Sequence, residues 1–301
     1  AFISYIQMFF KPIRDISEKY NIMQSAMAST ERIFEFMDLR EEIPEHKSPQ
    51  IPATLKGHLA FDNVSFAYED GHPVLQDISF EVKPGETVAV VGATGAGKTT
   101  LVNLIERFYD PNSGAVFLDG IDLRQWSTDE LHRNLGICMQ DVFIFAGSVT
   151  ENISLGRKQI NTKAVEQAAM NANALPFIRR LKNGFQQALG EDGATLSGGE
   201  RQLLSFARAL APEPTVLILD EATSSVDPET ERLIQEAISK MAAKRTTLVV
   251  AHRLSTIRDA DRILVMHEGR IREQGTHEEL MTLGGIYYKL NRLGSLEVTT
   301  Q

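Results

Sequence analysis

The chain has 301 residues, of which 31 are Lys or Arg and 40 are Asp or Glu, so its formal net charge is −9. Hydrophobic residues make up 43% of it and charged residues 24%, as in an average soluble globular protein, which excludes disorder, collagen and a multi-span membrane protein for most of the chain. The acidic balance argues against non-specific nucleic-acid binding, and a single cysteine, Cys138, excludes an intramolecular disulfide framework and a cysteine-rich metal site.

The sequence begins with an apolar stretch, residues 1–10, which is about half of the roughly 20 residues that a helix needs to cross a bilayer. It fits either a short core or amphipathic helix or the last half of a transmembrane helix. Lys11 and Arg14 follow it directly, as expected where a helix leaves a membrane on its cytoplasmic side.

A heptad-like stripe of mostly apolar residues then predicts one long helix that ends near Asp38. Several Met and Thr positions favour packing within a helix bundle over a stand-alone zipper. The stripe consists of Ile13, Ile16, Tyr20, Met23, Met27, Thr30, Phe34 and Met37.

Residues 40–57 contain three prolines and many charges and predict a linker, so we place the domain boundary there. This divides the chain into an N-terminal segment, 1–39, the linker, 40–57, a main domain, 58–293, and a C-terminal tail, 294–301.

Within the main domain, the apolar runs 88–91, 216–219 and 247–250 predict strands buried on both faces, as in a parallel sheet covered by helices. The early strands alternate more and have no long helices between them, which favours an antiparallel section. The predicted class is therefore α/β. Strands are expected at 58–66, 78–82, 87–91, 115–119, 135–139, 215–219, 246–251 and 262–267, and helices at 98–108, 162–183, 199–211, 229–243 and 276–292.

Residues 92–99 match the phosphate-binding pattern G-x-x-x-x-G-K-[ST] between a predicted strand and a predicted helix. Small residues let backbone N–H groups wrap closely around phosphate oxygens, and the helix N-terminus adds a partial positive charge. The pattern predicts that Lys98 reaches the β- and γ-phosphates and that the Thr99 hydroxyl binds Mg²⁺. The candidate nucleotide-binding residues of this loop are Gly92, Ala93, Thr94, Gly95, Ala96, Gly97, Lys98, Thr99 and Thr100.

Two carboxylates, Asp220 and Glu221, end the apolar strand that begins near residue 216. The first is suited to holding Mg²⁺, usually through water, and the second to orienting or deprotonating an attacking water. A strand that ends at a capped helix start is the alternative interpretation, and the phosphate-binding loop makes it the less favoured one.

Residues 196–202 read Leu-Ser-Gly-Gly-Glu-Arg-Gln and place Ser197 at a helix N-terminus, a second candidate anion site. With this run after the phosphate-binding loop and before the carboxylates, the chain resembles the nucleotide-binding domain of an ATP-binding-cassette (ABC) transporter over residues 58–290. The resemblance implies a P-loop NTPase (RecA-like) core with an antiparallel β subdomain and an inserted α-helical subdomain at about 141–210, preceded by the long N-terminal helix.

The resemblance also implies individual roles. Tyr68 resembles the aromatic residue that stacks on adenine, and Gln140 the Q-loop glutamine, a Mg²⁺ ligand that senses the membrane domain. Asp227, in the run 224–227, resembles part of the D-loop at the dimer contact, and His252 the switch histidine that contacts the γ-phosphate. The implied catalytic residues are Glu221, His252, Gln140 and Lys98, the metal ligands are Thr99, Gln140 and Asp220, and the nucleotide contacts across a dimer are Ser197, Gly198, Gly199, Glu200 and Asp227.

Residues 140–153 are similar to the corresponding stretch of ABC exporters, and residues 190–193 resemble the exporter X-loop. The chain departs from the usual pattern at Asp192, where Arg is more usual, and at Glu200, where Gln is commoner. In this family, residues 1–39 would be the end of the last transmembrane helix and its cytoplasmic extension.

The resemblance thus implies an ATP-hydrolysing motor on the cytoplasmic face of a cell membrane that uses ATP and Mg²⁺. Its partners would be a second nucleotide-binding domain and a transmembrane domain of the same polypeptide, with no nucleic acid. One alternative is one half of a heterodimeric exporter, because residues 27–34 resemble segments of both homodimeric and heterodimeric exporters. A soluble ABC-type ATPase acting on DNA or ribosomes is less favoured, since the chain has neither a long coiled-coil insertion nor a second cassette.

Overall fold

The computed structural model describes residues 2–38, 43–46, 48–49, 52, 54–69, 71–139, 141–190, 193, 195–221, 228–243, 245–251 and 257–298. Within these ranges, the side chains of residues 221, 228, 251 and 293–298 lie outside the description. The chain forms two compact units, residues 1–44 and 45–301.

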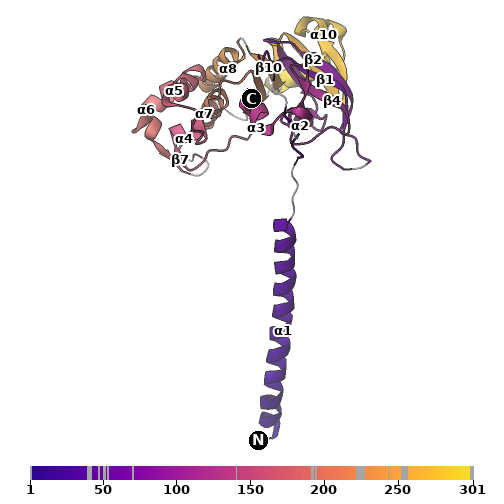
Figure 1. The fold of residues 1–301 in the computed structure, drawn as a ribbon, viewed down its shortest axis with the longest axis vertical. Helices are drawn as coiled ribbons and strands as arrows, with labels where there is room; N and C mark the ends of the chain where they lie inside the picture. Colours follow the sequence, from indigo (N-terminus) through magenta and orange to yellow (C-terminus); the bar gives the residue numbers. More distant parts are fainter. Residues whose placement is uncertain are drawn as a thin grey trace. The chain divides into compact units, whose positions relative to one another are not determined.

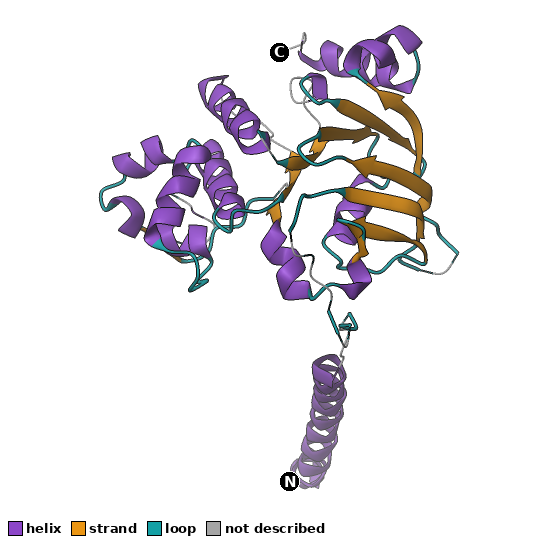
Figure 2. Ribbon diagram, turned by 45° about the horizontal axis from the view of Figure 1, so that its top comes forward, coloured by secondary structure: helices purple, strands orange, loops and turns teal. Residues whose placement is uncertain are grey.

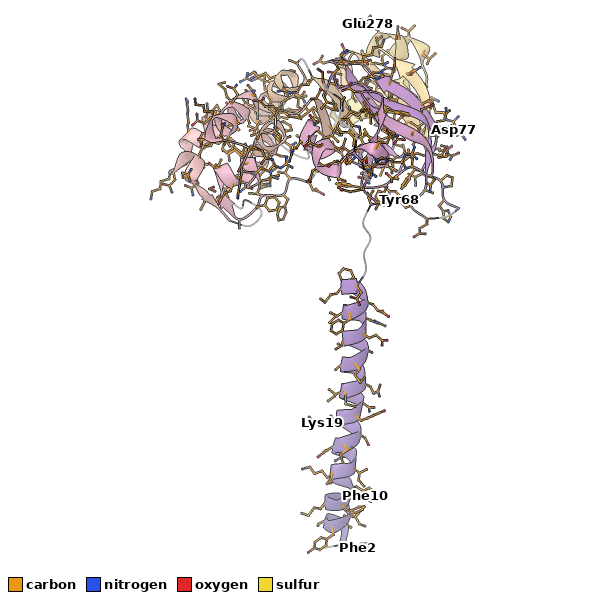
Figure 3. The ribbon with its side chains drawn as sticks, viewed as in Figure 1. Phe2, Phe10, Lys19, Tyr68, Asp77 and Glu278 are labelled. Atoms are coloured by element: carbon orange, nitrogen blue, oxygen red, sulfur yellow. The ribbon has the colours of Figure 1, made fainter. Side chains whose placement is uncertain are left out.

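The first unit is a single helix, α1 (Phe2–Asp38), as the heptad spacing predicts (Figure 1). None of its side chains is buried, and the large apolar residues of the stripe are exposed along its length. Phe2 and Phe10 are labelled near its beginning in Figure 3. Among the described helices, none combines the length and the apolar character needed to cross a membrane.

The second unit contains an antiparallel sheet with the strand order β2-β1-β4-β5. Its strands are β1 (Leu59–Phe66), β2 (Leu75–Val82), β4 (Ser113–Leu118) and β5 (Ile121–Asp122). Alternate residues of β1 and β2 are buried, as expected for strands with one face on the core. The predicted antiparallel section is therefore confirmed.

A second sheet of six strands has the order β12-β11-β3-β10-β9-β6 and is parallel except for its edge strand β12. The three apolar runs are three adjacent strands of this sheet, and residues of all three are fully buried, as predicted. The carboxyl ends of the five parallel strands meet at one edge. The strands are β3 (Thr87–Gly92), β6 (Leu135–Cys138), β9 (Val216–Glu221), β10 (Thr246–Ala251), β11 (Arg262–His267) and β12 (Arg270–Gly275).

The helices of the second unit fall into separate groups, and α4 to α7 gather away from the strands β1, β2 and β4 (Figures 1 and 2). Together with the two sheets, this arrangement confirms the predicted fold class. The helices are α2 (Lys98–Ile105), α3 (Thr128–Asn134), α4 (Val149–Ser154), α5 (Thr162–Asn171), α6 (Leu175–Arg180), α7 (Gly198–Leu210), α8 (Pro228–Ala242), α10 (His277–Leu283) and α11 (Ile286–Val298). Shorter pieces are the 3₁₀ turns η1 (Leu123–Gln125) and η2 (Gly184–Gln186) and the strand pair β7 (Gly147–Ser148) and β8 (Ala188–Leu189).

Two helices predicted as continuous are each interrupted. The segment 162–183 breaks between α5 and α6, where Asn173 has a positive φ of 54° and Pro176 stands in the first turn of the new helix. The segment 276–292 breaks between α10 and α11 at two consecutive glycines. The edge strand β12 was not predicted, because its mostly polar sequence lacks a run of apolar residues.

One carboxylate fixes the start of the antiparallel sheet. Asp119 Oδ2 accepts hydrogen bonds from the backbone N–H groups of Lys56 (2.8 Å) and Gly57 (3.0 Å), and Oδ1 accepts one from that of His58 (2.9 Å). The backbone N–H of Asp119 in turn donates to the carbonyl of His58 (2.7 Å). Residues 56–58 are therefore held against the β4–β5 turn immediately before β1 begins.

We expect Asp119→Ala to lower the free energy of unfolding by about 2–3 kcal/mol, because three backbone donors lose a charged acceptor. Urea denaturation of the variant and the parent measures this difference. Glu166→Ala, which removes an exposed carboxylate from α5, is the matched control and should leave the stability within about 0.5 kcal/mol. Equal stability of the two variants would contradict the role of Asp119.

Candidate nucleotide-binding site

The phosphate-binding loop joins the end of β3 to the beginning of α2. Gly92 is required because a Cβ at this position would lie 2.4 Å from the carbonyl oxygen of Met266 on β11. Gly97 caps α2 with a φ of +99°, a conformation that favours glycine. A Cβ on Gly95 would have no described atom within 4 Å, so this part of the loop faces open space. The loop is thus shaped by close packing at both ends and is open between them.

Lys98, the first residue of α2, is 7% exposed, and its Nζ donates to the carbonyls of Gly92 (2.8 Å) and Ala93 (3.1 Å). Burial lowers the pKa of Lys98, and the charge of Asp220 partly offsets this effect. The ammonium group therefore lies over the loop and close to a carboxylate, where phosphate oxygens would replace the carbonyls as its partners.

Asp220 reaches this position from β9, which is separated from β3 in the sheet only by β10. In the register, Asp220 pairs with Val250, and Val250 pairs with Val90 of β3. The strands end at the same edge, so Asp220, 9% exposed, and the phosphate-binding loop share that edge. The structure thus brings the predicted Lys98 and Asp220 together.

The donor set fits Mg²⁺ shared with a nucleotide. The Thr99 residue is exposed at the start of α2, and Asp220 supplies a carboxylate. Mg²⁺ prefers oxygen ligands and is usually held by one or two carboxylates together with substrate phosphates and water. In the part of the chain that the structure describes, no group of three or more His, Cys, Asp or Glu residues could hold a metal ion.

Several predicted site residues cannot be placed. Glu221 occupies the last position of β9, paired with Ala251, but its side chain is not described. Gln140, Asp227 and His252, together with the unusual Asp192, lie outside the described residues. Their roles remain predictions.

Tyr68 follows β1 and lies against the helix that the phosphate-binding loop begins (labelled in Figure 3). Its hydroxyl is 3.2 Å from Thr100 Oγ1 and accepts a hydrogen bond from Asn103 Nδ2 (3.0 Å). The side chain is 46% exposed, so an aromatic surface is available beside the loop. The contact of Tyr68 with a nucleotide base stays a prediction.

Residues 196–202, the Leu-Ser-Gly-Gly-Glu-Arg-Gln run, lead into α7 with a complete capping box. The Ser197 hydroxyl accepts from the N–H of Glu200 (3.2 Å), and the Glu200 carboxylate accepts from the N–H of Ser197 (3.0 Å). Glutamate at position 200 therefore has a local role that glutamine could also fill. Ser197 and Gly198 are exposed, so the N-terminus of α7 is accessible to an anion.

The structure also reveals a buried acid that sequence reasoning missed. Glu106 follows α2, is almost fully buried, and its Oε1 has no hydrogen-bond partner among the described residues. Burial, and to a smaller extent the nearby charge of Asp220, together raise the pKa of Glu106 to about 7. The only signal in the sequence is a lone acid next to the apolar positions of the predicted helix 98–108.

Comparison with known proteins gives consistent matches. The family model described as ABC transporter matches residues 75–224. The chain is 46% identical over 292 residues to the "Fatty acid ABC transporter ATP-binding/permease protein" of Mycobacterium tuberculosis, covering 97% of this chain and 46% of the relative. It is 45% identical over 294 residues to the "ATP-dependent lipid A-core flippase" of Chromobacterium violaceum, covering 97% of this chain and 50% of the relative.

Among solved structures, the chain is similar to a bacterial Atm1-family ABC exporter with ATP bound. The TM-score is 0.79 and the identity 37%, and the match covers 95% of this chain and 50% of that one. The chain spans about half the length of the curated relatives that it matches.

We expect Lys98→Ala to weaken Mg-ATP binding by about 10- to 100-fold, because a buried charge-assisted hydrogen bond to phosphate is lost. Isothermal titration calorimetry measures the dissociation constant. Lys163→Ala, which removes an exposed lysine of α5, should leave it unchanged. Parent-like affinity in the Lys98 variant would show that this loop is not the phosphate site.

The buried carboxyl group of Glu106 should make the free energy of unfolding depend on pH. Its raised pKa means that the folded chain binds a proton more tightly than the unfolded chain, so its contribution to stability falls as pH rises from 4.5 through about 7. The difference between these values corresponds to about 3 kcal/mol. Relative to the parent, Glu106→Gln should therefore gain about 2.5 kcal/mol between pH 5 and pH 8 in urea denaturation without nucleotide or Mg²⁺. An offset that does not change with pH would contradict the assignment.

Proposed function

The chain belongs to the ABC transporter family, and we propose that it is the ATP-binding and ATP-hydrolysing motor domain of an exporter. The observation that carries the proposal is the pair of anion-binding elements in one unit. The loop 92–99 joins β3 to α2 and packs against β11 and β2, whereas Ser197 begins α7 in the helical group. The name of the Mycobacterium tuberculosis relative combines ATP-binding and permease functions, and this chain would correspond to its ATP-binding part.

Two copies would bind ATP head to tail. The phosphate-binding loop of one copy would face the Ser197 end of α7 in the second copy, so that each ATP is held by both. The exposure of Ser197 and Gly198 supports this arrangement, because the N-terminus of α7 is accessible to an anion. Closure around ATP would supply the conformational change that drives transport, and hydrolysis would release it.

The chemistry would depend on positioning and electrostatics. Glu221 would orient and deprotonate the attacking water, while Lys98 would stabilise negative charge on the β- and γ-phosphates. Gln140 and His252 would contact the metal and the γ-phosphate. Asp220 and Thr99 would hold Mg²⁺, which neutralises phosphate charge when bound.

The transmembrane domain would contact an apolar surface of the second unit. A cavity of about 260 Å³ opens beside Phe108 and Leu155 and is also lined by Arg208. Arg208 contacts both Phe143 and Phe145, whose rings pack edge to face at 4.9 Å. All four apolar side chains are about half exposed, and contiguous exposed apolar surface on a folded domain marks an interaction site. The exposed apolar residues of α1 would be covered by the same membrane domain. The relatives carry different cargo in their names, as expected for a motor shared by exporters of different substrates.

The solution mass of Glu221→Gln tests the dimer. Blocking hydrolysis should trap the closed state, so light scattering should show a shift from 33.5 kDa to about twice that value when Mg-ATP is added. A matched sample with Lys98→Ala in addition should stay monomeric at an Mg-ATP concentration that just saturates Glu221→Gln, because it binds the phosphates more weakly. A Glu221→Gln chain that binds ATP but stays monomeric would contradict pairing between identical copies and favour a non-identical partner.

The same variant tests catalysis. We expect Glu221→Gln to lower the ATP turnover of the assembled transporter by about 10²- to 10⁴-fold, the size of a general-base contribution. A phosphate-release assay under saturating ATP measures it. Turnover at the parent rate would remove Glu221 from the mechanism.

A further inference from the structure

The ring of Tyr68 is held at its outer end by a pair of hydrogen bonds. Asn103 Nδ2 donates to the hydroxyl oxygen, and the same hydroxyl shares a second hydrogen bond with Thr100 Oγ1, in which either oxygen can be the donor. Both partners belong to α2, the helix that begins with Lys98. The outer end of the phenol is therefore attached at two points to the same helix that the phosphate-binding loop begins.

Two other aromatic rings fix the plane of Tyr68. Phe66 lies edge to face with it at 4.9 Å with an interplanar angle of 86°, and Tyr109 does so at 5.0 Å and 88°. Phe66 and Tyr109 also contact each other at 5.5 Å. Phe66 is buried, so this aromatic group is anchored in the core. Such perpendicular pairs are favoured arrangements that resist rotation of either ring.

A half-exposed tyrosine without these contacts would sample several rotamers. Here two hydrogen bonds and two ring contacts restrict it before any ligand binds, while 46% of the side chain remains accessible. Binding that does not have to immobilise a side chain avoids the corresponding loss of conformational entropy.

We propose that Asn103 is a positioning residue for the nucleotide base: with Thr100 and Tyr109, it holds Tyr68 in the orientation in which the ring stacks on the base. This inference rests on the proposed function, in which Tyr68 is the stacking residue. Asn103 itself need not touch the nucleotide. Its effect is confined to the part of the affinity that comes from the base, because the phosphates bind at the other end of α2.

The test compares a nucleotide with a ligand that has no base. Dissociation constants for Mg-ATP and for Mg-tripolyphosphate are measured by calorimetry on the parent, Asn103→Ala, Tyr68→Phe, the double variant and Tyr68→Ala. Alanine at position 103 favours helix, so α2 should fold. Asn171→Ala is the matched control, since Asn171 is also a partly buried helical asparagine in a side-chain hydrogen bond, with Gln167 (3.0 Å).

We expect Asn103→Ala and Tyr68→Phe each to weaken Mg-ATP binding by about three- to tenfold, the cost of immobilising one side chain on binding. The double variant should be no weaker than Tyr68→Phe, because loss of the hydroxyl already breaks the hydrogen bond that Asn103→Ala removes. Tripolyphosphate affinity should stay within about twofold throughout, and Asn171→Ala should match the parent for both ligands.

Other outcomes would overturn the inference in distinguishable ways. Unchanged ATP affinity in Asn103→Ala, with weakened affinity in Tyr68→Ala, would remove the positioning role and leave stacking intact. Equal losses for ATP and tripolyphosphate in Asn103→Ala would mean that Asn103 acts on α2 as a whole and not on Tyr68. Parent-like ATP affinity in Tyr68→Ala would remove the stacking role itself, and the positioning role with it.

Discussion

The candidate site depends on how closely the backbone packs on either side of the phosphate-binding loop. At its beginning, Gly92 lies so near the Met266 carbonyl of β11 that no side chain fits, and at its end a Cβ on Gly97 would lie 2.6 Å from Leu75 Cδ2 of β2. The loop is thus clamped between a strand of the parallel sheet and a strand of the antiparallel sheet. A hydrogen bond from Gln76 N–H to the Gly269 carbonyl (2.9 Å) joins the same two sheets near this point. The antiparallel sheet therefore shapes the phosphate site as well as contributing Tyr68.

A small set of buried charges lies behind this loop. Asp220 acts on two groups, since it raises the pKa of both Lys98 and Glu106, whereas burial lowers the first and raises the second. In a medium of low dielectric constant, such charges interact more strongly than on the surface. Negative phosphate oxygens at the loop would add to the attraction on Lys98 and to the repulsion on the two acids. An anionic ligand at the loop would therefore act on the pKa of Glu106 in the same direction as Asp220 does.

The sequence predicts the phosphate-binding loop better than it predicts the residues that pack around this loop. The spacing of glycines around Lys98 specifies the loop because its chemistry depends on local backbone freedom, and the apolar runs specify the central strands because those strands are buried on both faces. What the sequence does not reveal depends on tertiary contacts. Asn103 and Glu106 look like ordinary helical positions until the fold places one beside Tyr68 and buries the other near Asp220. The interruption of the predicted helix 162–183 was missed although Pro176 marks it, because the apolar periodicity continues across the break.

The attachment of residues 56–58 to Asp119 has a mechanical consequence. Tension applied along the chain from the N-terminal side would pass Leu55, which packs against the core, and then reach residues 56–58. There the three N–H groups bonded to the Asp119 carboxylate, and the His58 carbonyl bonded to the Asp119 N–H, would share it. Because β1 begins at the next residue and pairs with both β2 and β4, the load spreads over three strands that must shear together. Such an anchor is stiff along the direction of pull. Displacement of the preceding segment would be transmitted to the antiparallel sheet as a whole, and from there to the Leu75 side of the phosphate-binding loop.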